Sequence, residues 1–174
     1  MIRSASSSSA VSREFTWSRI RCNRSYELTQ DGVCVGTLRR PSFWSTSFLA
    51  ETAEGRWTFR RSGCLGTGAE ILDANSAPPI ATFKQPWGGR GTLTFTNGET
   101  FHLECNGWWR PVWSVTTAEG KPVLKLHARE KTVETSGNAA VPDRRLSLLT
   151  MFVWYRVLQA QEDAASAAMV AITG

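Results

Sequence analysis

The sequence contains few of the side chains that usually carry catalysis. It has only two histidines, His102 and His127, no Gly-x-Ser-x-Gly motif and no pair of carboxylates in an apolar setting. Acid–base and nucleophilic catalysis need such groups, because a proton must be held or released close to the reacting atoms. The sequence therefore predicts no catalytic residue, and an enzyme assembled from distant residues is kept only as an alternative.

Metal-binding and redox motifs are also missing. The four cysteines form no Cys-x-x-Cys pair, which is the spacing of many zinc sites and of thioredoxin-like motifs. We predict no metal site and no cofactor. We expect all four to be reduced, small buried side chains: Cys22, Cys34, Cys64 and Cys105.

The first dozen residues, MIRSASSSSAVS, lack the apolar stretch of a secretory signal. Their serine run and the absence of acidic residues indicate a disordered tail over residues 1–13. An organellar transit peptide has a similar composition and stays as an alternative. We expect a cytoplasmic protein, peripheral at membranes if it meets them.

No run of about 20 uncharged apolar residues is present, so the sequence predicts no transmembrane span. The most apolar segment, LSLLTMFVWYRVLQ, follows Arg144 and Arg145 and contains Arg156. At about 100° per residue, its apolar side chains cover the whole circumference of a helix. A helix of this kind has to be enclosed by protein.

What the sequence does contain is a long series of short β-rich runs. Turn signals such as QDG, AEG, TNG and CNG recur between residues 15 and 129, with Val, Thr, Phe and Trp between them and no helical periodicity. This spacing indicates an all-β sandwich or barrel. A closed barrel gives the apolar helix its place, because inward side chains can surround it on every side.

Three hairpins have a register that their apolar faces fix. In LTFTNGETFHL, a three-residue loop pairs Leu93 with Phe101 and places Gly98 in the left-handed conformation, which glycine adopts without cost. In PVWSVTTAEGKPVLKLHARE, a loop with an even number of residues predicts the pairs Val115 with Leu124 and Trp113 with Leu126. In FWSTSFLAETAEGRWTFRR, an even loop predicts the pair Ala50 with Phe59, and places Trp44, Phe48 and Trp57 on the same side.

These elements make one domain, because 174 residues of which 41% are hydrophobic suffice for one core and not for two ordinary ones. We predict an antiparallel barrel domain over residues 14–161. Its central helix runs over about residues 144–160 after a cap at Asp143, and a C-terminal tail covers residues 162–174. A helix of roughly 17 residues is about 25 Å long, close to the height of such a barrel.

Many short strands followed by one very hydrophobic helix resemble the tubby C-terminal fold, which plant LURP-one-related proteins and the phospholipid scramblases share. The resemblance covers residues 15–161 and is carried by GRWTFRRSG, GKPVLKLHARE and LSLLTMFVWYRVLQ. It implies a mainly β fold with a closed antiparallel barrel of about 12 short strands around the helix. Some members of the family bind phosphoinositides or nucleic acid. The chain lacks the palmitoylated cysteine cluster and proline-rich leader of scramblases, which argues against lipid scrambling.

The chain is basic, with a formal charge of +5 and a pI near 9.4, which favours acidic partners such as anionic lipid or nucleic acid. In GKPVLKLHARE, the residues that alternate with the inward Leu124, Leu126 and Ala128 form a basic outer row that suits headgroups or phosphates. A solvated strand edge is the alternative. Arg56, Arg60 and Arg61 extend the row if the two strands adjoin. The row consists of Lys121, Val123, Lys125, His127, Arg129 and Lys131.

Two loops are further candidates. Residues 86–91, PWGGRG, combine flexible amides with Arg90 and Trp87, which suits an anion-binding nest, an interfacial anchor or simply a long turn. Residues 106–113, NGWWRPVW, suit an aromatic platform for bases or sugars. Alternatively, Trp113 belongs to the core while Trp108 and Trp109 cap one end of the barrel.

Three classes of function follow. The favoured one is a non-enzymatic module that docks on anionic, phosphoinositide-like membrane lipid. The alternatives are a nucleic-acid or protein interaction module and an uncharacterised enzyme. The anion-binding hypothesis covers Arg56, Arg60, Arg61, Arg90, Lys121, Lys125, His127, Arg129 and Lys131.

Overall fold

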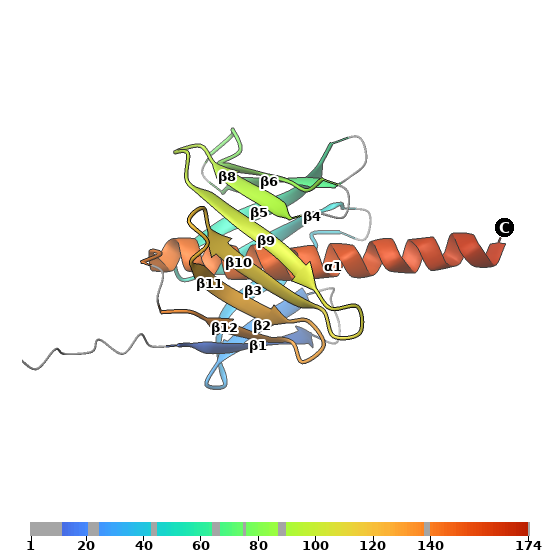
Figure 1. Ribbon diagram of the computed structural model, residues 1–174, viewed down its shortest axis with the longest axis horizontal. Coiled ribbons are helices and arrows are strands. Elements are labelled where there is room, and N and C mark those ends of the chain that lie inside the picture. Colours follow the sequence, from blue (N-terminus) through green and yellow to red (C-terminus); the bar gives the residue numbers. More distant parts are fainter. Residues whose placement is uncertain are drawn as a thin grey trace, which may run out of the picture.

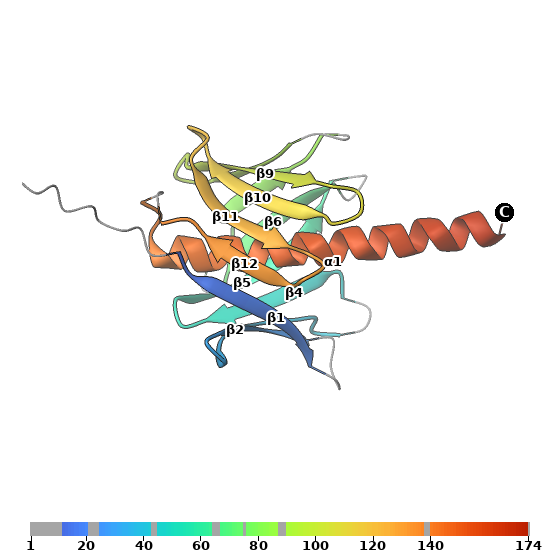
Figure 2. The same cartoon turned by 60° about the horizontal axis from the view of Figure 1, so that its bottom comes forward.

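The computed structural model describes residues 12–20, 25–42, 45–63, 67–74, 76–86, 90–137 and 140–173. Twelve antiparallel strands close into one barrel, and a single helix runs through its middle (Figure 1, Figure 2). The predicted fold class is confirmed. The elements are β1 (Glu14–Ile20), β2 (Ser25–Gln30), β3 (Val33–Arg39), β4 (Ser47–Thr52), β5 (Gly55–Ser62), β6 (Gly68–Asp73), β7 (Ala81–Lys84), β8 (Gly91–Phe95), β9 (Thr100–Asn106), β10 (Val112–Thr117), β11 (Pro122–His127), β12 (Thr132–Thr135) and α1 (Asp143–Thr173).

The strands alternate buried and outward side chains because successive residues of a strand point to opposite faces. In β5, Trp57 and Phe59 are buried and Arg56 and Arg60 are exposed. The same alternation recurs in β4, β6, β8, β9 and β10. Each strand has its sequence neighbours beside it, and β1 pairs with β12 to close the ring.

Two tight turns show how the sequence sets the register. Asp31 and Gly32 have φ angles of 51° and 78° between β2 and β3, as a two-residue hairpin turn requires. Gly98 has a φ of 86° and its N–H donates to the carbonyl of Phe95 at 2.9 Å. The predicted pair Leu93 with Phe101 is confirmed, as are Val115 with Leu124 and Trp113 with Leu126.

The predicted pair of Ala50 with Phe59 is wrong by two residues. Ala50 lies opposite Trp57, because the two-residue turn falls at residues 53–54. A shift of two keeps every side chain on its own face, so the predicted inward set is still buried, while Trp44 lies outside the described residues. The buried members are Phe48, Ala50, Trp57 and Phe59.

A β-bulge corrects the predicted outer row of β11. Val115 pairs with Leu124, but the next residue, Thr116, pairs with Pro122. Val123 is therefore an extra residue in the strand, as in a β-bulge. It is 1% exposed, so it packs in the core and does not belong to the outer row.

The predicted burial of the cysteines is wrong where the structure tests it. Cys34 near the start of β3 and Cys105 near the end of β9 are both exposed. Cys22 and Cys64 lie outside the described residues. Both tested cysteines sit where a strand nears the end of the barrel, outside the layer that packs on the helix.

Helix α1 is buried on every side over residues 148–159. Aromatic side chains of the strands meet it edge to face: the ring centre of Phe152 lies 5.5 Å from that of Phe59 and 5.4 Å from that of Phe83. Enclosure by the barrel thus explains why the segment is apolar around its whole circumference.

The helix does not end near residue 160 as predicted. It continues to Thr173, so most of the predicted C-terminal tail is helical, and residues 160–171 are exposed beyond the barrel (Figure 1). Alanine, the strongest helix former, is the commonest residue in this stretch and favours continuation of the helix. Within the described residues, no helix has the length and hydropathy that crossing a membrane requires.

The end of the predicted N-terminal tail belongs to the barrel. The N–H of Arg13 donates to Thr135 Oγ1 at 3.1 Å, and the N–H of Thr135 donates to the carbonyl of Arg13 at 3.0 Å. These bonds extend the pairing of β1 with β12. Residues 1–11 of the predicted tail lie outside the described residues.

The barrel has two different ends. At the start end, where α1 begins, Arg145 donates to Glu99 at 2.8 Å and Arg144 pairs with Asp73. At the opposite exit end, α1 leaves the barrel (Figure 1). The connections β1–β2, β3–β4, β5–β6, β7–β8, β9–β10 and β11–β12 lie at the exit end.

Candidate functional site

The predicted basic residues of β5 and β11 lie on two opposite walls of the barrel. Arg56, Arg60 and Arg61 are on β5, whereas Lys125 and His127 are on β11. Five strands separate β5 from β11 in one direction (β6 to β10) and five in the other (β4, β3, β2, β1 and β12). The arginines of β5 therefore do not extend the basic row of β11.

The arginines away from β11 already have acidic partners. Such pairing leaves less charge for an external anion, although each exposed pair contributes little to stability. In the predicted anion-binding loop, residues 87–89 lie outside the described residues. The pairs are Arg56 with Glu51 (3.4 Å), Arg60 with Glu70 (3.2 Å), Arg61 with Asp163 (2.8 Å) and Arg90 with Glu104.

The basic row of β11 is divided into three parts. Lys125 is exposed but lies opposite Glu134 of β12, whose carboxylate is also 3.8 Å from His127 Nε2. The strand ends at His127. The other predicted residues are in turns at opposite ends of the barrel: Lys121 at the start end, and Arg129 and Lys131 at the exit end.

The β9–β10 connection holds two tryptophans in solvent at the exit end. Trp108 is 96% exposed and Trp109 is 77% exposed, so the expectation that they cap the barrel is wrong, while Trp113 is in the core as expected. Gly107 before them has a φ of 90°, and a Cβ there would lie 2.6 Å from the carbonyl oxygen of Arg110. Only glycine fits this tight backbone.

The β9–β10 connection is bonded to the β11–β12 turn. The N–H of Ala128 donates to the carbonyl of Pro111 at 3.1 Å, which sets the two connections side by side. The exposed side chains on them include three cations and one carboxylate, Glu130. We call the following set the exit rim: Trp108, Trp109, Arg110, Arg129 and Lys131.

The cations of the exit rim differ from the arginines of β5. Across the described part of the chain, no ion pair joins Arg110, Arg129 or Lys131 to a carboxylate. Glu130, between Arg129 and Lys131, is the carboxylate of the same turn. Sequence reasoning named all but Arg110 of these residues, but it assigned them to different surfaces.

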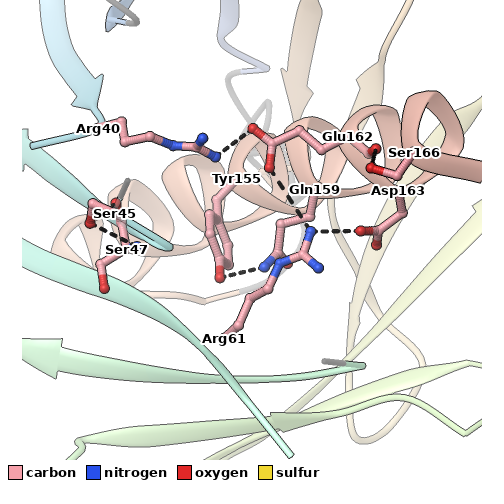
Figure 3. A network of polar contacts seen from close by, with 9 residues as sticks. All are labelled: Arg40, Ser45, Ser47, Arg61, Tyr155, Gln159, Glu162, Asp163 and Ser166. Carbon is pink, nitrogen blue, oxygen red and sulfur yellow. Dashed lines mark hydrogen bonds and ion pairs between the residues drawn. The ribbon is translucent and has the colours of Figure 1, made fainter. Parts of the chain in front are cut away.

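A polar network holds α1 where it leaves the barrel (Figure 3). Glu162 pairs with Arg40 and lies 4.0 Å from Arg61, and Arg61 also pairs with Asp163 at 2.8 Å. Arg40 follows β3 and Arg61 belongs to β5. Two separate strands therefore hold the last charged turn of the helix.

The network continues into the barrel through polar residues of α1. Gln159 Nε2 donates to Tyr155 Oη at 2.6 Å (Figure 3), and Arg156 Nη2 donates to Gln85 Oε1 at 2.9 Å. The guanidinium of Arg156 also lies 4.7 Å from the ring centre of Phe83. Burial lowers the pKa of Arg156 and raises the pKa of Tyr155 to about 12. Sequence reasoning missed this network, although polar residues inside an apolar helix were its signal.

We expect Tyr155 to make the protein sensitive to alkali. The folded protein keeps the phenol proton up to about pH 12, whereas an unfolded chain loses it near pH 10. Above about pH 10 the unfolded state binds fewer protons, so the free energy of unfolding falls as pH rises, by about 2 to 3 kcal/mol by pH 12. Urea denaturation at about pH 9 and about pH 11.5 measures this loss.

The Tyr155→Phe variant isolates this effect. Between the two pH values it should lose about 2 kcal/mol less stability than the wild type. Equal losses in the wild type and Tyr155→Phe would show that Tyr155 is not the titrating group.

A cavity lies at the start end, away from the exit rim. It has a volume of about 750 Å³ and is lined by Trp57, Phe95 and Leu148 together with Arg144 and Arg145. Both arginines are held by carboxylates of the strand connections and of β6. In the described ranges, no group of three His, Cys, Asp or Glu side chains is placed to hold a metal ion.

The chain matches no protein-family model, no curated protein and no solved structure. Function is therefore inferred from the chemistry of the exit rim and of the residues around it.

Proposed function

We propose that the protein is a non-enzymatic module that docks on anionic membrane surfaces, with phosphoinositide-like lipid as its ligand. The observation that carries the proposal is the exit rim, where exposed cations lie beside two exposed tryptophans. Basic side chains attract anionic headgroups, and tryptophan favours the boundary between headgroups and hydrocarbon. Both kinds of side chain at one end of the barrel support contact with lipid.

The expected strength of docking follows from the charges. Each Lys or Arg near an anionic surface contributes about 1 kcal/mol, so the three cations of the exit rim contribute about 3 kcal/mol and Glu130 opposes them by about 1 kcal/mol. Burial of the tryptophans in the interface adds to this. Binding should weaken as salt rises, because exposed charges are screened beyond about 8 Å at physiological ionic strength.

The resemblance to the tubby C-terminal fold remains part of the proposal. It implies a closed barrel around a hydrophobic helix, and some members of that family bind phosphoinositides. On this proposal the protein is cytoplasmic and peripheral at the membrane.

We expect the double variant Arg129→Glu/Lys131→Glu to bind vesicles of phosphatidylcholine and phosphatidylserine at least about tenfold more weakly than the wild type. Each reversal removes an attraction of about 1 kcal/mol and adds a repulsion. The melting temperature should stay nearly the same, because exposed substitutions change stability by less than about 0.5 kcal/mol. Vesicle co-sedimentation at moderate salt measures the affinity.

The matched control is Arg56→Glu/Lys121→Glu, which changes the net charge equally at the start end of the barrel. It should keep most of the binding. Equal loss in both double variants would show that overall charge, not the exit rim, causes binding. Binding of the wild type to nucleic acid but not to vesicles would favour the nucleic-acid interaction module instead.

A further inference from the structure

Helix α1 leaves the barrel at the same end as the exit rim and continues past it. Figures 1 and 2 agree that its last turns project beyond the strand connections. The described side chains from Ala160 to Ala171 are exposed. A surface that approaches the exit rim therefore meets the projecting helix as well.

The projecting part of the helix contains no charged side chain. Residues 164–173 read AASAAMVAIT, and Met169 and Val170 are 65% and 72% exposed. The last charged residues, Glu162 and Asp163, are held by arginines of the barrel (Figure 3). The helix thus changes from charged to uncharged where it leaves the barrel.

Geometry links this segment to the tryptophans of the exit rim. Since α1 extends further than the β9–β10 connection (Figure 1), a flat bilayer that meets this connection perpendicular to the helix axis also takes up the end of α1. Ten residues at about 1.5 Å each span about 15 Å, which is half of a hydrocarbon core of roughly 30 Å. Apart from the carbonyls of its last turn, the helix satisfies its backbone groups internally, as hydrocarbon requires.

We infer that residues 164–173 insert into one leaflet of an anionic bilayer when the exit rim docks, with Trp108 and Trp109 at the headgroup boundary. This inference rests on the membrane docking proposed above. Charge favours lipid over a second copy of the chain as the occupant, because each exit rim has three cations, with Glu130 as the carboxylate beside them, and two rims would repel each other. Arg40 and Arg61 keep the carboxylates of Glu162 and Asp163 at the level of the headgroups.

The test places a charge of either sign at Ala171, deep in the proposed inserted segment. Ala171→Asp and Ala171→Lys should both weaken co-sedimentation with phosphatidylcholine and phosphatidylserine vesicles at least about tenfold, because either charge opposes transfer into hydrocarbon. The same substitutions at Ala118, exposed in the β10–β11 turn at the start end, should change binding little. Brominated acyl chains should quench the wild type's fluorescence more than that of Trp108→Phe/Trp109→Phe.

The outcomes separate this inference from the proposed function. If the wild type binds and Ala171→Lys binds more tightly, the segment stays in water beside the headgroups and the insertion is refuted, while docking stands. If the wild type binds no vesicles, the docking proposal itself fails. If the wild type is a dimer without lipid and Ala171→Asp is a monomer, a second copy is the occupant and the inference is overturned.

Discussion

A chain truncated before Pro142 is expected to lose cooperative folding altogether. Helix α1 contributes nine buried hydrophobic side chains to the core. At about 1.5 to 3 kcal/mol each they supply roughly 13 to 27 kcal/mol, which is as large as or larger than the usual stability of a domain, about 5 to 15 kcal/mol. Without the helix, the inward aromatic rings of the strands would line a water-filled space. Circular dichroism and a thermal melt of the truncated chain measure the result.

The matched control ends the chain after Asp163. It keeps the buried part of α1 and its pairs with Arg40 and Arg61, and it removes only the projecting residues 164–173. This shorter cut should leave a sharp thermal transition. A sharp transition after the cut before Pro142 as well would mean that the barrel closes without its helix.

The second large effect is expected for Trp154→Ala, which should lower the free energy of unfolding by about 3 to 5 kcal/mol. The indole of Trp154 is 2% exposed and stacks on that of Trp17, with ring centres 5.3 Å apart and planes 8° apart. Loss of the indole leaves a cavity that the surrounding strands cannot fill, because hydrogen bonds fix the positions of the strands around the closed barrel. Phe152→Ala should cost a similar amount for the same reason.

Trp109→Ala is the control for the same chemical change. That side chain is 77% exposed, so its removal should alter stability by less than about 0.5 kcal/mol. Urea denaturation of the two variants gives both values. Similar losses would place Trp154 outside the core and contradict the enclosed helix.

The fold was predictable because its two main signals, the apolar helix and the regularly spaced turns, do not depend on the exact pairing of the strands. A segment apolar on all sides needs an enclosure, and regularly spaced turns supply strands that can form one. The strand register was predicted correctly where the hairpin loop needs a residue with positive φ, as at Gly98. It failed by two residues at Ala50, since a shift of two conserves the faces that the prediction used. The buried Val123 was missed because a β-bulge leaves no mark in an alternating pattern.

The candidate site was predictable only in its residue types. Whether a cation is paired with a carboxylate depends on residues far away in the sequence, as Asp163 is for Arg61. The hydrogen bond from Ala128 to Pro111, which joins the two connections of the exit rim, continues the pairing of β10 with β11. The length of α1 was underestimated because the polar residues around Glu162 resembled a helix end, whereas they anchor the helix to the barrel.

Hydrogen–deuterium exchange on phosphatidylcholine and phosphatidylserine vesicles tests most directly that the exit end is the docking surface. Lipid should protect the backbone amides of residues 107–110, 128–131 and 164–173. The turns of the start end, at residues 96–98 and 118–121, should exchange as fast as in solution. Protection at the start end, or no protection at the exit end of bound protein, would contradict this assignment.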